Sequence, residues 1–494
     1  MEKDFQDLIK EVKKYYPKTN EKLINLAWEV AKRAHKGQKR LTGEAFVNHP
    51  LAVSRTLASW RLDQTTIIAG LLHDTVEDGD ATREELVEKF GEDVALLVDG
   101  VTKVTNIRLV GSSESQYVET LRKMILVMAK DLRVVLLKLA DRLHNMKTLY
   151  GLPPEKQYKN ALETIEIYAP LAERLGIGKI KGELQDLAFP YIDHEKYEIV
   201  KKNSARFYKK AEQEIVQIKK VLLKEFAEEK IPVEVQGRRK HLYSLWKKLQ
   251  RDSIDWDFES IHDIIAFRIL VDNIKDCYIS LGIVHKNFKP YPKVPLSDYI
   301  AQPKPNGYRS IHTKVFGPHG KIIEVQIRTR EMHEQAEFGA AAHWAYSEAK
   351  STGASQKDLD KGKISTNGEK LNWVRQLVQW QKELSDSKEF LDAVKLDAFR
   401  SRILVFSPKG DVFDLPEGAT PVDYAFSVHT NLPNYIGSVL VNGKIVSLDH
   451  KLSNGDLIFI NKSKQKRAVK KDWLEFVVST TARSGIKKQL RREP

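Results

Sequence analysis

The stretch GLLHDTVEDG, residues 70–79, places one histidine and three acidic residues directly after an apolar run. If this stretch is helical, His73 lies beside Glu77 and Asp74 lies beside Asp78, because residues four apart share a helix face. Carboxylates gathered in this way repel one another unless a cation lies between them. The pattern therefore predicts a helix that carries a cation site.

Two further segments offer ligands for the same cation. His49 lies upstream, and the segment LADRLHNM supplies Asp141 and Asn145, which are again four apart on one helical face. Two imidazoles and two carboxylates from separate helices suit a divalent ion such as manganese or iron. We therefore predict that His49 and Asp141 join His73 and Asp74 around such an ion.

The acidic residues beyond these ligands have a possible chemical role. A bound divalent ion lowers the pKa of its water, and Glu77 and Asp78 could then move protons or orient that water. The alternative is structural: a His-Asp pair is often a surface or capping pair, and Asp141 with Asn145 could be solvated helix positions. Apolar residues precede both segments, which favours sites near the core.

Composition excludes several classes of protein. The chain has 494 residues, 41% of them hydrophobic and 30% charged, which fits about three globular domains. The single cysteine, Cys277, excludes a disulfide framework. No apolar run approaches the roughly 20 residues of a membrane span, and the N-terminus lacks a signal-peptide core. We expect a cytoplasmic protein with no membrane partner.

The net charge of +14 is concentrated in two segments. Residues 236–251 carry six basic and no acidic residues, and residues 461–494 carry eleven basic and three acidic residues. Local basic surplus of this kind suggests partners that bear phosphate. A basic helix without further context is usually a solvated or nucleic-acid-facing surface, and that alternative stays open here.

Periodicity predicts the organisation of the chain. Residues 1–195 have the three- and four-residue apolar spacing of helices, and residues 196–350 alternate strand and helix signals, which predicts a mixed sheet. Residues 351–398 read as a linker and a helix, residues 399–462 as a small β-rich domain with a hairpin turn at Asn442-Gly443, and residues 463–494 as a basic tail.

Long ordered motifs resemble a known family. The helical part resembles HD-superfamily phosphohydrolases, the β-rich segment resembles a TGS domain, and the whole resembles RelA/SpoT homologues shortened after that domain. The resemblance implies three folds: an all-α hydrolase, a mixed α/β nucleotidyltransferase-like synthetase and a β-grasp domain. The motifs are GQKRLTGEAFVNHP, GLLHDTVEDG, KLADRLHNMKTL, GRRKHLYSLWKKL, IHDIIAFRI, PKPNGYRSIHT, EVQIRT and EFGAAAHWAY.

In the helical part, the resemblance implies hydrolysis of guanosine tetra- and pentaphosphate, (p)ppGpp, with manganese as cofactor. Glu77 and Asp78 would activate the water that removes the 3′-pyrophosphate. Leu41 departs from the family pattern, in which a basic residue often stands. The implied manganese ligands are His49, His73, Asp74 and Asp141, and the implied nucleotide-binding residues are Arg40, Asn145 and Thr148.

In the second part, the resemblance implies transfer of pyrophosphate from ATP to GDP or GTP. Such a transfer needs cationic clamps, magnesium held by carboxylates and a base near the acceptor hydroxyl. Asp263 and Glu324 are the implied catalytic and magnesium-binding residues, and Tyr308 would stack on guanine. The other implied nucleotide-binding residues are Arg238, Lys240, Ser244, Lys248, Arg268, Lys304, His312, Gln326 and Arg328.

Some departures leave alternatives open. Pro295 to Asp298 stand where the family carries a short charged signature, and Arg309 stands where glutamine is common. One alternative is therefore a hydrolase-dominant enzyme with a weak synthetase. A second is a non-enzymatic RNA or ribosome adaptor that uses the basic tail and His429, a candidate contact to the tRNA acceptor end. In the bifunctional interpretation, residues 195–235 are expected to couple the two activities.

Overall fold

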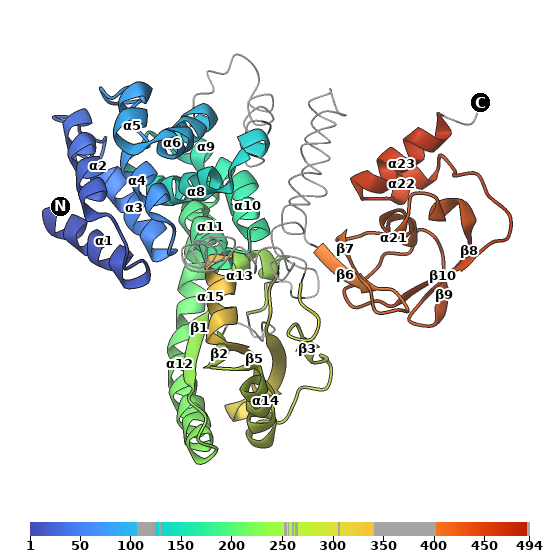
Figure 1. Ribbon diagram of the computed structural model, residues 1–494. Helices are drawn as coiled ribbons and strands as arrows, with labels where there is room; N and C mark the ends of the chain where they lie inside the picture. Colours follow the sequence, from blue (N-terminus) through green and yellow to red (C-terminus); the bar gives the residue numbers. More distant parts are fainter. Residues whose placement is uncertain are drawn as a thin grey trace, which may run out of the picture. The chain divides into compact units, whose positions relative to one another are not determined.

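The computed structural model describes residues 1–105, 122, 124–127, 130–250, 254, 256–258, 261, 265–304, 307–339 and 402–491. The described residues up to 339 belong to one compact unit, and residues 402–491 belong to a second (Figure 1). Asp263 and the predicted linker and helix of residues 351–398 lie outside the described residues. Among the described helices, none combines the length and apolar character that crossing a membrane requires.

The described residues of the N-terminal part of the first unit form helices joined by turns and loops, as the periodicity predicts (Figure 1). Side-chain caps begin several of its helices: Asn20 accepts a hydrogen bond from the backbone N–H of Leu23, and Asp63 from that of Thr66. The helices are α1 (Glu2–Tyr15), α2 (Glu21–Ala34), α3 (Asn48–Ser59), α4 (Gln64–Leu72), α5 (Arg83–Phe90), α6 (Glu92–Thr105), α8 (Leu132–Lys147), α9 (Pro154–Glu163), α10 (Ala169–Arg174) and α11 (Gly178–Ile192).

The end of α4 corrects one prediction. The helix stops at Leu72, and residues 73–78 form successive turns instead of continuing the helical face. The hydroxyl of Thr75 donates to the carbonyl of Leu72 at 2.7 Å, and His73 Nδ1 lies 2.9 Å from the carbonyl oxygen of Gly70. In these hydrogen bonds, backbone carbonyl oxygens at the helix end accept from side chains. Side-chain hydrogen bonds of this kind compete with continuation of the helix.

The second part of the first unit is built on a mixed five-stranded sheet, as predicted. Its strand order is β1-β2-β5-β4-β3, in which β2 and β5 are parallel and the other pairs are antiparallel. The strands are β1 (Glu234–Arg239), β2 (Ile265–Val271), β3 (Ser297–Asp298), β4 (Ile311–Phe316) and β5 (Ile322–Thr329), and the helices are α12 (His194–Glu228), α13 (Leu242–Leu249), α14 (Ile274–Asn287) and α15 (Arg330–Phe338).

Helix α12 and the sheet share one core. Ile218, Leu222 and Phe226 of α12 are buried together with Phe267 and Ile269 of β2. Helix α11 contacts α8 of the helical part as well as α13 and α15 of the sheet part. The two parts of this unit therefore share a packed junction, with α11 at its centre.

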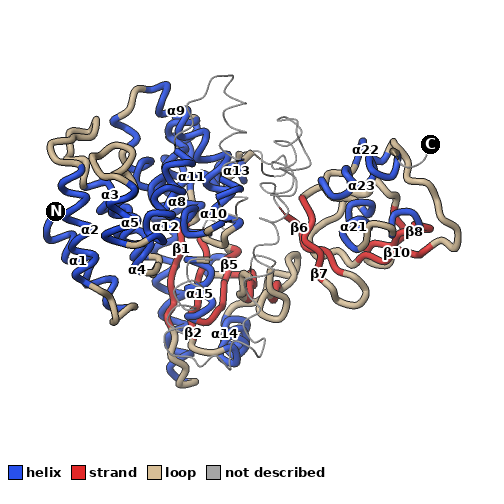
Figure 2. Tube along the Cα trace, turned by 45° about the horizontal axis from the view of Figure 1, so that its top comes forward, coloured by secondary structure: helices blue, strands red, loops and turns tan. Residues whose placement is uncertain are grey.

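The second unit is small and β-rich, and its helices pack over two short sheets (Figure 2). Asn442 and Gly443 both have positive φ, 52° and 79°, and join β8 to β9. Positive φ at both central residues is typical of the two-residue hairpin turn that the sequence predicts. The elements are β6 (Arg402–Phe406), β7 (Val412–Pro416), α21 (Pro421–Val428), β8 (Ile436–Val441), β9 (Lys444–Val446), β10 (Ile458–Lys462), α22 (Trp473–Phe476) and α23 (Thr480–Leu490).

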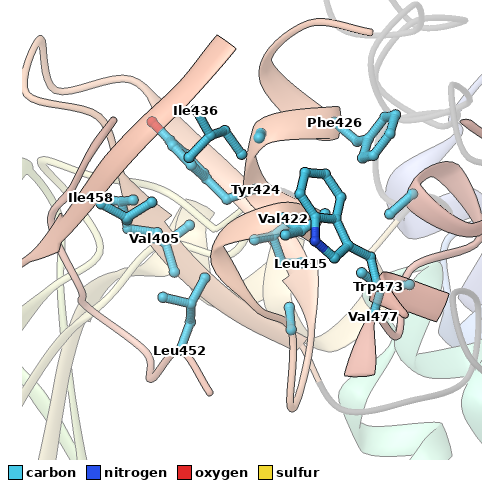
Figure 3. Close-up of a cluster of buried hydrophobic side chains, with 14 of the residues drawn as sticks. Val405, Leu415, Val422, Tyr424, Phe426, Ile436, Leu452, Ile458, Trp473 and Val477 are labelled. Atoms are coloured by element: carbon cyan, nitrogen blue, oxygen red, sulfur yellow. The ribbon is translucent and has the colours of Figure 1, made fainter. Parts of the chain in front are cut away.

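The segment predicted as a separate basic tail completes this core. Trp473 and Val477 are buried against residues of α21 (Figure 3). The buried carboxylate of Asp423 accepts hydrogen bonds from the backbone N–H groups of Val478, at 3.1 Å, and Ser479, at 2.7 Å. The interpretation of 463–494 as a tail is therefore wrong for residues up to 491, because their apolar face is buried while their lysines and arginines lie mostly outside.

Candidate active sites

Four predicted metal ligands meet in the helical part. His49 of α3, His73 at the end of α4 and Asp141 of α8 are buried, and one ligand atom from each lies within 4.8 Å of the others. Asp74 is close to both histidines: its carboxylate oxygens lie 3.1 Å from His73 Nε2 and 3.4 Å from His49 Nε2. The structure therefore brings together residues that are up to 92 positions apart in the sequence.

The orientation of His73 fits a metal ligand. Its Nδ1 lies 2.9 Å from the carbonyl oxygen of Gly70, so Nδ1 carries the proton and Nε2 presents a lone pair. This Nε2 is buried, and none of the described residues forms a hydrogen bond with it, although Asp74 is near. A buried nitrogen lone pair without a donor, beside carboxylates, is the environment that a divalent cation would satisfy.

The carboxylate of Asp141 is held in its ionised form. Burial alone would raise its pKa, but the nearby ammonium of Lys138 holds the pKa well below its usual range. Lys138 Nζ lies 2.7 Å from Oδ2, and the side-chain amide of Asn145 donates to Oδ1 at 2.6 Å. An ionised, oriented carboxylate is what metal coordination needs.

Arg40, Asn145 and Thr148, predicted to bind nucleotide, also lie together. The Arg40 guanidinium donates to Asn145 Oδ1 at 2.6 Å and to Thr148 Oγ1 at 3.2 Å. Leu41 is largely exposed beside them, with 74% of its surface accessible. These contacts place the three polar residues next to Asp141, a predicted metal ligand, through Asn145.

His144 is a site residue that the sequence reasoning missed. Its Nδ1 lies 2.8 Å from His49 Nδ1 and 3.1 Å from the Arg40 guanidinium. Its position in LADRLHNM could have indicated this role, because it follows Asp141 by three residues on α8 and residues three apart share a helix face. Burial, His49 and Arg40 lower the pKa of His144 to about 3, so its imidazole is neutral at ordinary pH.

Glu77 and Asp78 have environments that favour the protonated carboxyl group. Burial, followed by the charges of Asp78 and Asp74, raises the pKa of Glu77. Burial and the charge of Asp74 also raise the pKa of Asp78. A carboxyl group with a raised pKa is better able to hold and exchange a proton near neutral pH.

In the sheet part, four predicted residues form one row of polar contacts. The hydroxyl of Tyr308 lies 2.8 Å from His312 Nε2, and His312 Nδ1 lies 3.3 Å from the carboxylate of Glu324. The amide of Gln326 donates to the same Glu324 oxygen at 2.9 Å. The register of β4 and β5 explains this row, because His312 lies directly opposite Gln326.

A buried cluster of arginines lies on β2 and β5. The guanidinium of Arg268 lies 3.1 Å and that of Arg328 lies 3.4 Å from the carboxylate of Glu337 on α15. Burial, and then the charge of Arg328, lowers the pKa of Arg268 to about 10, and the nearby charge of Arg238 acts in the same direction. One carboxylate among three guanidiniums leaves a surplus of positive charge, which suits an anionic ligand.

Glu337 is the second site residue that the sequence reasoning missed. It belongs to the motif EFGAAAHWAY and lies on α15, yet only the packing of this helix shows which groups its carboxylate meets. His333, one turn earlier, lies 2.7 Å from the guanidinium of Arg328 through its Nδ1. Helix α15 thus provides the partners of both buried arginines.

The remaining predicted residues are placed less tightly. Lys304 Nζ lies over the rings of Tyr299, at 4.5 Å, and Tyr308, at 5.3 Å. Lys240 instead lines a cavity of about 400 Å³ together with residues of α11 and α12, such as Asp186 and Tyr208. Ser244 and Lys248 are half-buried on α13. The roles of these residues in binding nucleotide stay predictions.

Comparison with known proteins is consistent with this division into an HD-type helical part, a mixed α/β part and a small β-rich unit. An HD domain model matches residues 27–178, the model "Region found in RelA / SpoT proteins" matches residues 237–351, and a TGS domain model matches residues 403–462. These matches define the class as a multidomain protein of the RelA/SpoT type.

Similar full-length proteins agree with the domain matches. A GTP pyrophosphokinase of Myxococcus xanthus is 46% identical over 98% of this chain and 62% of its own length. A guanosine-3′,5′-bis(diphosphate) 3′-pyrophosphohydrolase of Aquifex aeolicus is 44% identical over 100% of this chain and 67% of its own length. A bifunctional (p)ppGpp synthase/hydrolase of Mycobacterium tuberculosis is 43% identical over 97% and 64%, respectively. The chain belongs to the RelA/SpoT family, and it spans roughly three-fifths of the length of the first of these relatives.

Proposed function

We propose that this chain both hydrolyses (p)ppGpp at its 3′-pyrophosphate and makes (p)ppGpp by transferring pyrophosphate from ATP to GDP or GTP. The observation that carries the proposal is the presence of two distinct residue clusters in one unit. One is a buried set of cation ligands around His49, His73 and Asp141, and the other is an arginine cluster beside the Tyr308–His312–Glu324 row.

In the proposed hydrolase, the ligands His49, His73, Asp74 and Asp141 would hold a divalent ion, which we propose to be manganese. When bound, such an ion makes water more acidic and so provides hydroxide near neutral pH. Glu77 and Asp78, with their raised carboxyl pKa values, would hold and pass on the proton. Arg40, Asn145 and Thr148 would hold the nucleotide beside them.

In the proposed synthetase, Tyr308 would stack on guanine, and Glu324 would accept the proton of the ribose 3′-hydroxyl. Arg268 and Arg328 are buried and Arg238 is half-buried, and their excess positive charge would bind the triphosphate of ATP. Magnesium at Asp263 and Glu324 would neutralise phosphate charge. Lys240, Ser244, Lys248, Lys304, His312 and Gln326 complete the proposed nucleotide contacts.

A paired assay tests both activities at once. Wild type, Asp74→Ala and Glu324→Ala are incubated either with ATP, GDP and magnesium or with (p)ppGpp and manganese. We expect Asp74→Ala to lose hydrolysis and keep synthesis, and Glu324→Ala to do the reverse. If the wild-type protein forms no labelled guanosine tetraphosphate, the synthetase proposal is wrong.

A hydrolase-dominant enzyme is the second candidate, and the place of Asp298 favours it. The carboxylate of Asp298 accepts hydrogen bonds from the backbone N–H groups of Ile300 and Ala301, both at 2.9 Å, and from the hydroxyl of Tyr278, also at 2.9 Å. This carboxylate therefore shapes a turn beside β4, and none of these contacts is to a nucleotide-binding residue. Synthesis slower than hydrolysis by a factor of about 100 or more would support this candidate.

We propose further that the protein acts in the cytoplasm, and that the TGS domain and the basic surface of residues 463–491 contact tRNA or the ribosome. His429, the predicted tRNA contact, is exposed at the end of α21 and accepts a hydrogen bond from the backbone N–H of Asn431 at 3.2 Å. A non-enzymatic adaptor would bind RNA in a salt-sensitive way and would be unaffected by Asp74→Ala or Glu324→Ala.

A further inference from the structure

Two imidazole rings face each other at the edge of the metal-ligand cluster. His49 Nδ1 and His144 Nδ1 lie 2.8 Å apart, although the residues are 95 positions apart in the sequence. Two nitrogens at this distance form a hydrogen bond only if one carries the proton and the other presents a lone pair. The pair therefore exists in one of two arrangements, and the neighbours decide which.

Arg40 decides the arrangement of this pair. A guanidinium can only donate hydrogen bonds, and Arg40 Nη1 lies 3.1 Å from His144 Nδ1 and 3.4 Å from His49 Nδ1. The shorter of the two contacts favours His144 Nδ1 as the acceptor, and we therefore assign the proton of the imidazole pair to His49 Nδ1. A neutral His49 with its proton on Nδ1 has its lone pair on Nε2, which lies 3.2 Å from Asp141 Oδ1 and 3.4 Å from Asp74 Oδ2.

The same guanidinium fixes a second metal ligand through Asn145. Arg40 donates to Asn145 Oδ1 at 2.6 Å, so the amide nitrogen of Asn145 points the other way and donates to Asp141 Oδ1 at 2.6 Å. The carboxylate can only accept, and the guanidinium can only donate, so this amide has a single allowed orientation. Arg40 therefore reaches His49 through His144 and Asp141 through Asn145, two consecutive residues of α8.

We propose that His144 is a positioning residue, which selects the metal-binding tautomer of His49. Its Nδ1 accepts a hydrogen bond from His49 Nδ1–H, Arg40 favours it as the acceptor, and it does not itself bind the metal. Groups that orient metal-bound histidines in this way typically change metal affinity by about 10- to 100-fold when removed. This inference rests on the proposed metal site and is independent of the proposed nucleotide substrates.

The test measures metal affinity directly, without nucleotide. Free Mn²⁺ is followed by its electron paramagnetic resonance signal during titration of wild type, His144→Leu and His144→Asn. Leucine and asparagine have similar size, but only asparagine offers an acceptor oxygen near the position of His144 Nδ1. We expect His144→Leu to weaken Mn²⁺ binding by about 10-fold or more and His144→Asn to bind within about threefold of wild type.

Controls separate this inference from the proposed function. His194, which is exposed at the start of α12, provides a matched His194→Leu variant that should bind Mn²⁺ like wild type. If His144→Leu does not fold, as judged by circular dichroism, His144→Ala takes its place in the comparison with His144→Asn. Equal Mn²⁺ affinity of wild type and His144→Leu, or an asparagine variant as weak as the leucine variant, would overturn the positioning role. If wild type itself shows no saturable Mn²⁺ binding that Asp74→Ala abolishes, the metal site of the proposed function fails instead.

Discussion

The guanidinium of Arg268 on β2 lies 3.1 Å from the carboxylate of Glu337 on α15, and both side chains are largely buried. Arg328 shares the same carboxylate at 3.4 Å. The negative charge of Glu337 therefore offsets the repulsion between two buried cations. In the proposed synthetase, this arrangement keeps the arginines in place before a triphosphate arrives.

Replacing Glu337 by glutamine should destabilise the first unit, because two buried guanidiniums would lose their common carboxylate. Removing one partner of a buried ion pair typically costs about 3 kcal/mol. Urea unfolding of Glu337→Gln measures this loss. The control is Glu334→Gln, a half-exposed neighbour on the same helix that is paired with Arg61 at 3.0 Å. Added ATP should restore more stability to Glu337→Gln than to wild type, because its phosphates replace the missing charge. Equal stability of both variants would contradict the prediction.

His333 should make stability depend on pH. Burial, followed by the charges of Arg328 and Arg268, lowers its pKa from the ordinary 6.5 to about 4 in the folded protein. The unfolded chain therefore binds a proton at a higher pH than the folded chain does, so stability falls as the pH drops from about 6.5 to about 4. His333→Asn keeps an acceptor for Arg328 but cannot be protonated. Denaturant unfolding at several pH values should show a shallower loss for this variant, and parallel curves for both proteins would rule the effect out.

Gly70 should be required for close packing of α4 against α3. A Cβ at this position would lie 2.7 Å from both Leu57 Cδ1 and Ser54 Oγ, so Gly70→Ala must displace these side chains or push the helices apart. Overpacking of this kind costs about 1–3 kcal/mol, and the shift should also displace His73 and weaken Mn²⁺ binding. Gly282→Ala on α14 is the matched control, because a Cβ there has no neighbour within 4 Å. Thermal unfolding and Mn²⁺ titration of both variants provide the check.

Asp423 should hold the last two helices onto the second unit. Its buried carboxylate accepts hydrogen bonds from the backbone N–H groups of Thr420, at 2.8 Å, and Ser479, at 2.7 Å. Asp423→Asn would turn one acceptor into a donor that faces an N–H group, at a cost of about 2 kcal/mol. Calorimetry should show a lower melting temperature for this unit, whereas Asp449→Asn, at an exposed position, should melt like wild type. Unchanged melting of Asp423→Asn would refute this role.

Much of the fold follows from local sequence patterns. Three- and four-residue apolar spacing predicts the helical part because each helix must bury one face. Asn442-Gly443 predicts its hairpin because both residues tolerate positive φ. The predicted metal ligands can also be read from short motifs, because His73 and Asp74 are adjacent in GLLHDTVEDG and Asp141 lies in LADRLHNM. The residue at which α4 ends was not predicted from the sequence. It depends on the side-chain hydrogen bonds of His73 and Thr75 to backbone carbonyls, and only the structure shows that these bonds form.

The sequence by itself determined the order of the three folds and predicted the four residues of the candidate metal site. Only the tertiary structure decided how those ligands are oriented and what opposes the buried charges. His144 meets His49 because α3 packs against α8, and Glu337 meets Arg268 because α15 packs against β2. Residue type determines which hydrogen bonds and which charge a side chain can contribute. The residue that it contacts depends on packing between segments that are distant in the chain. The same kind of packing buries α22 and α23 in the core of the second unit.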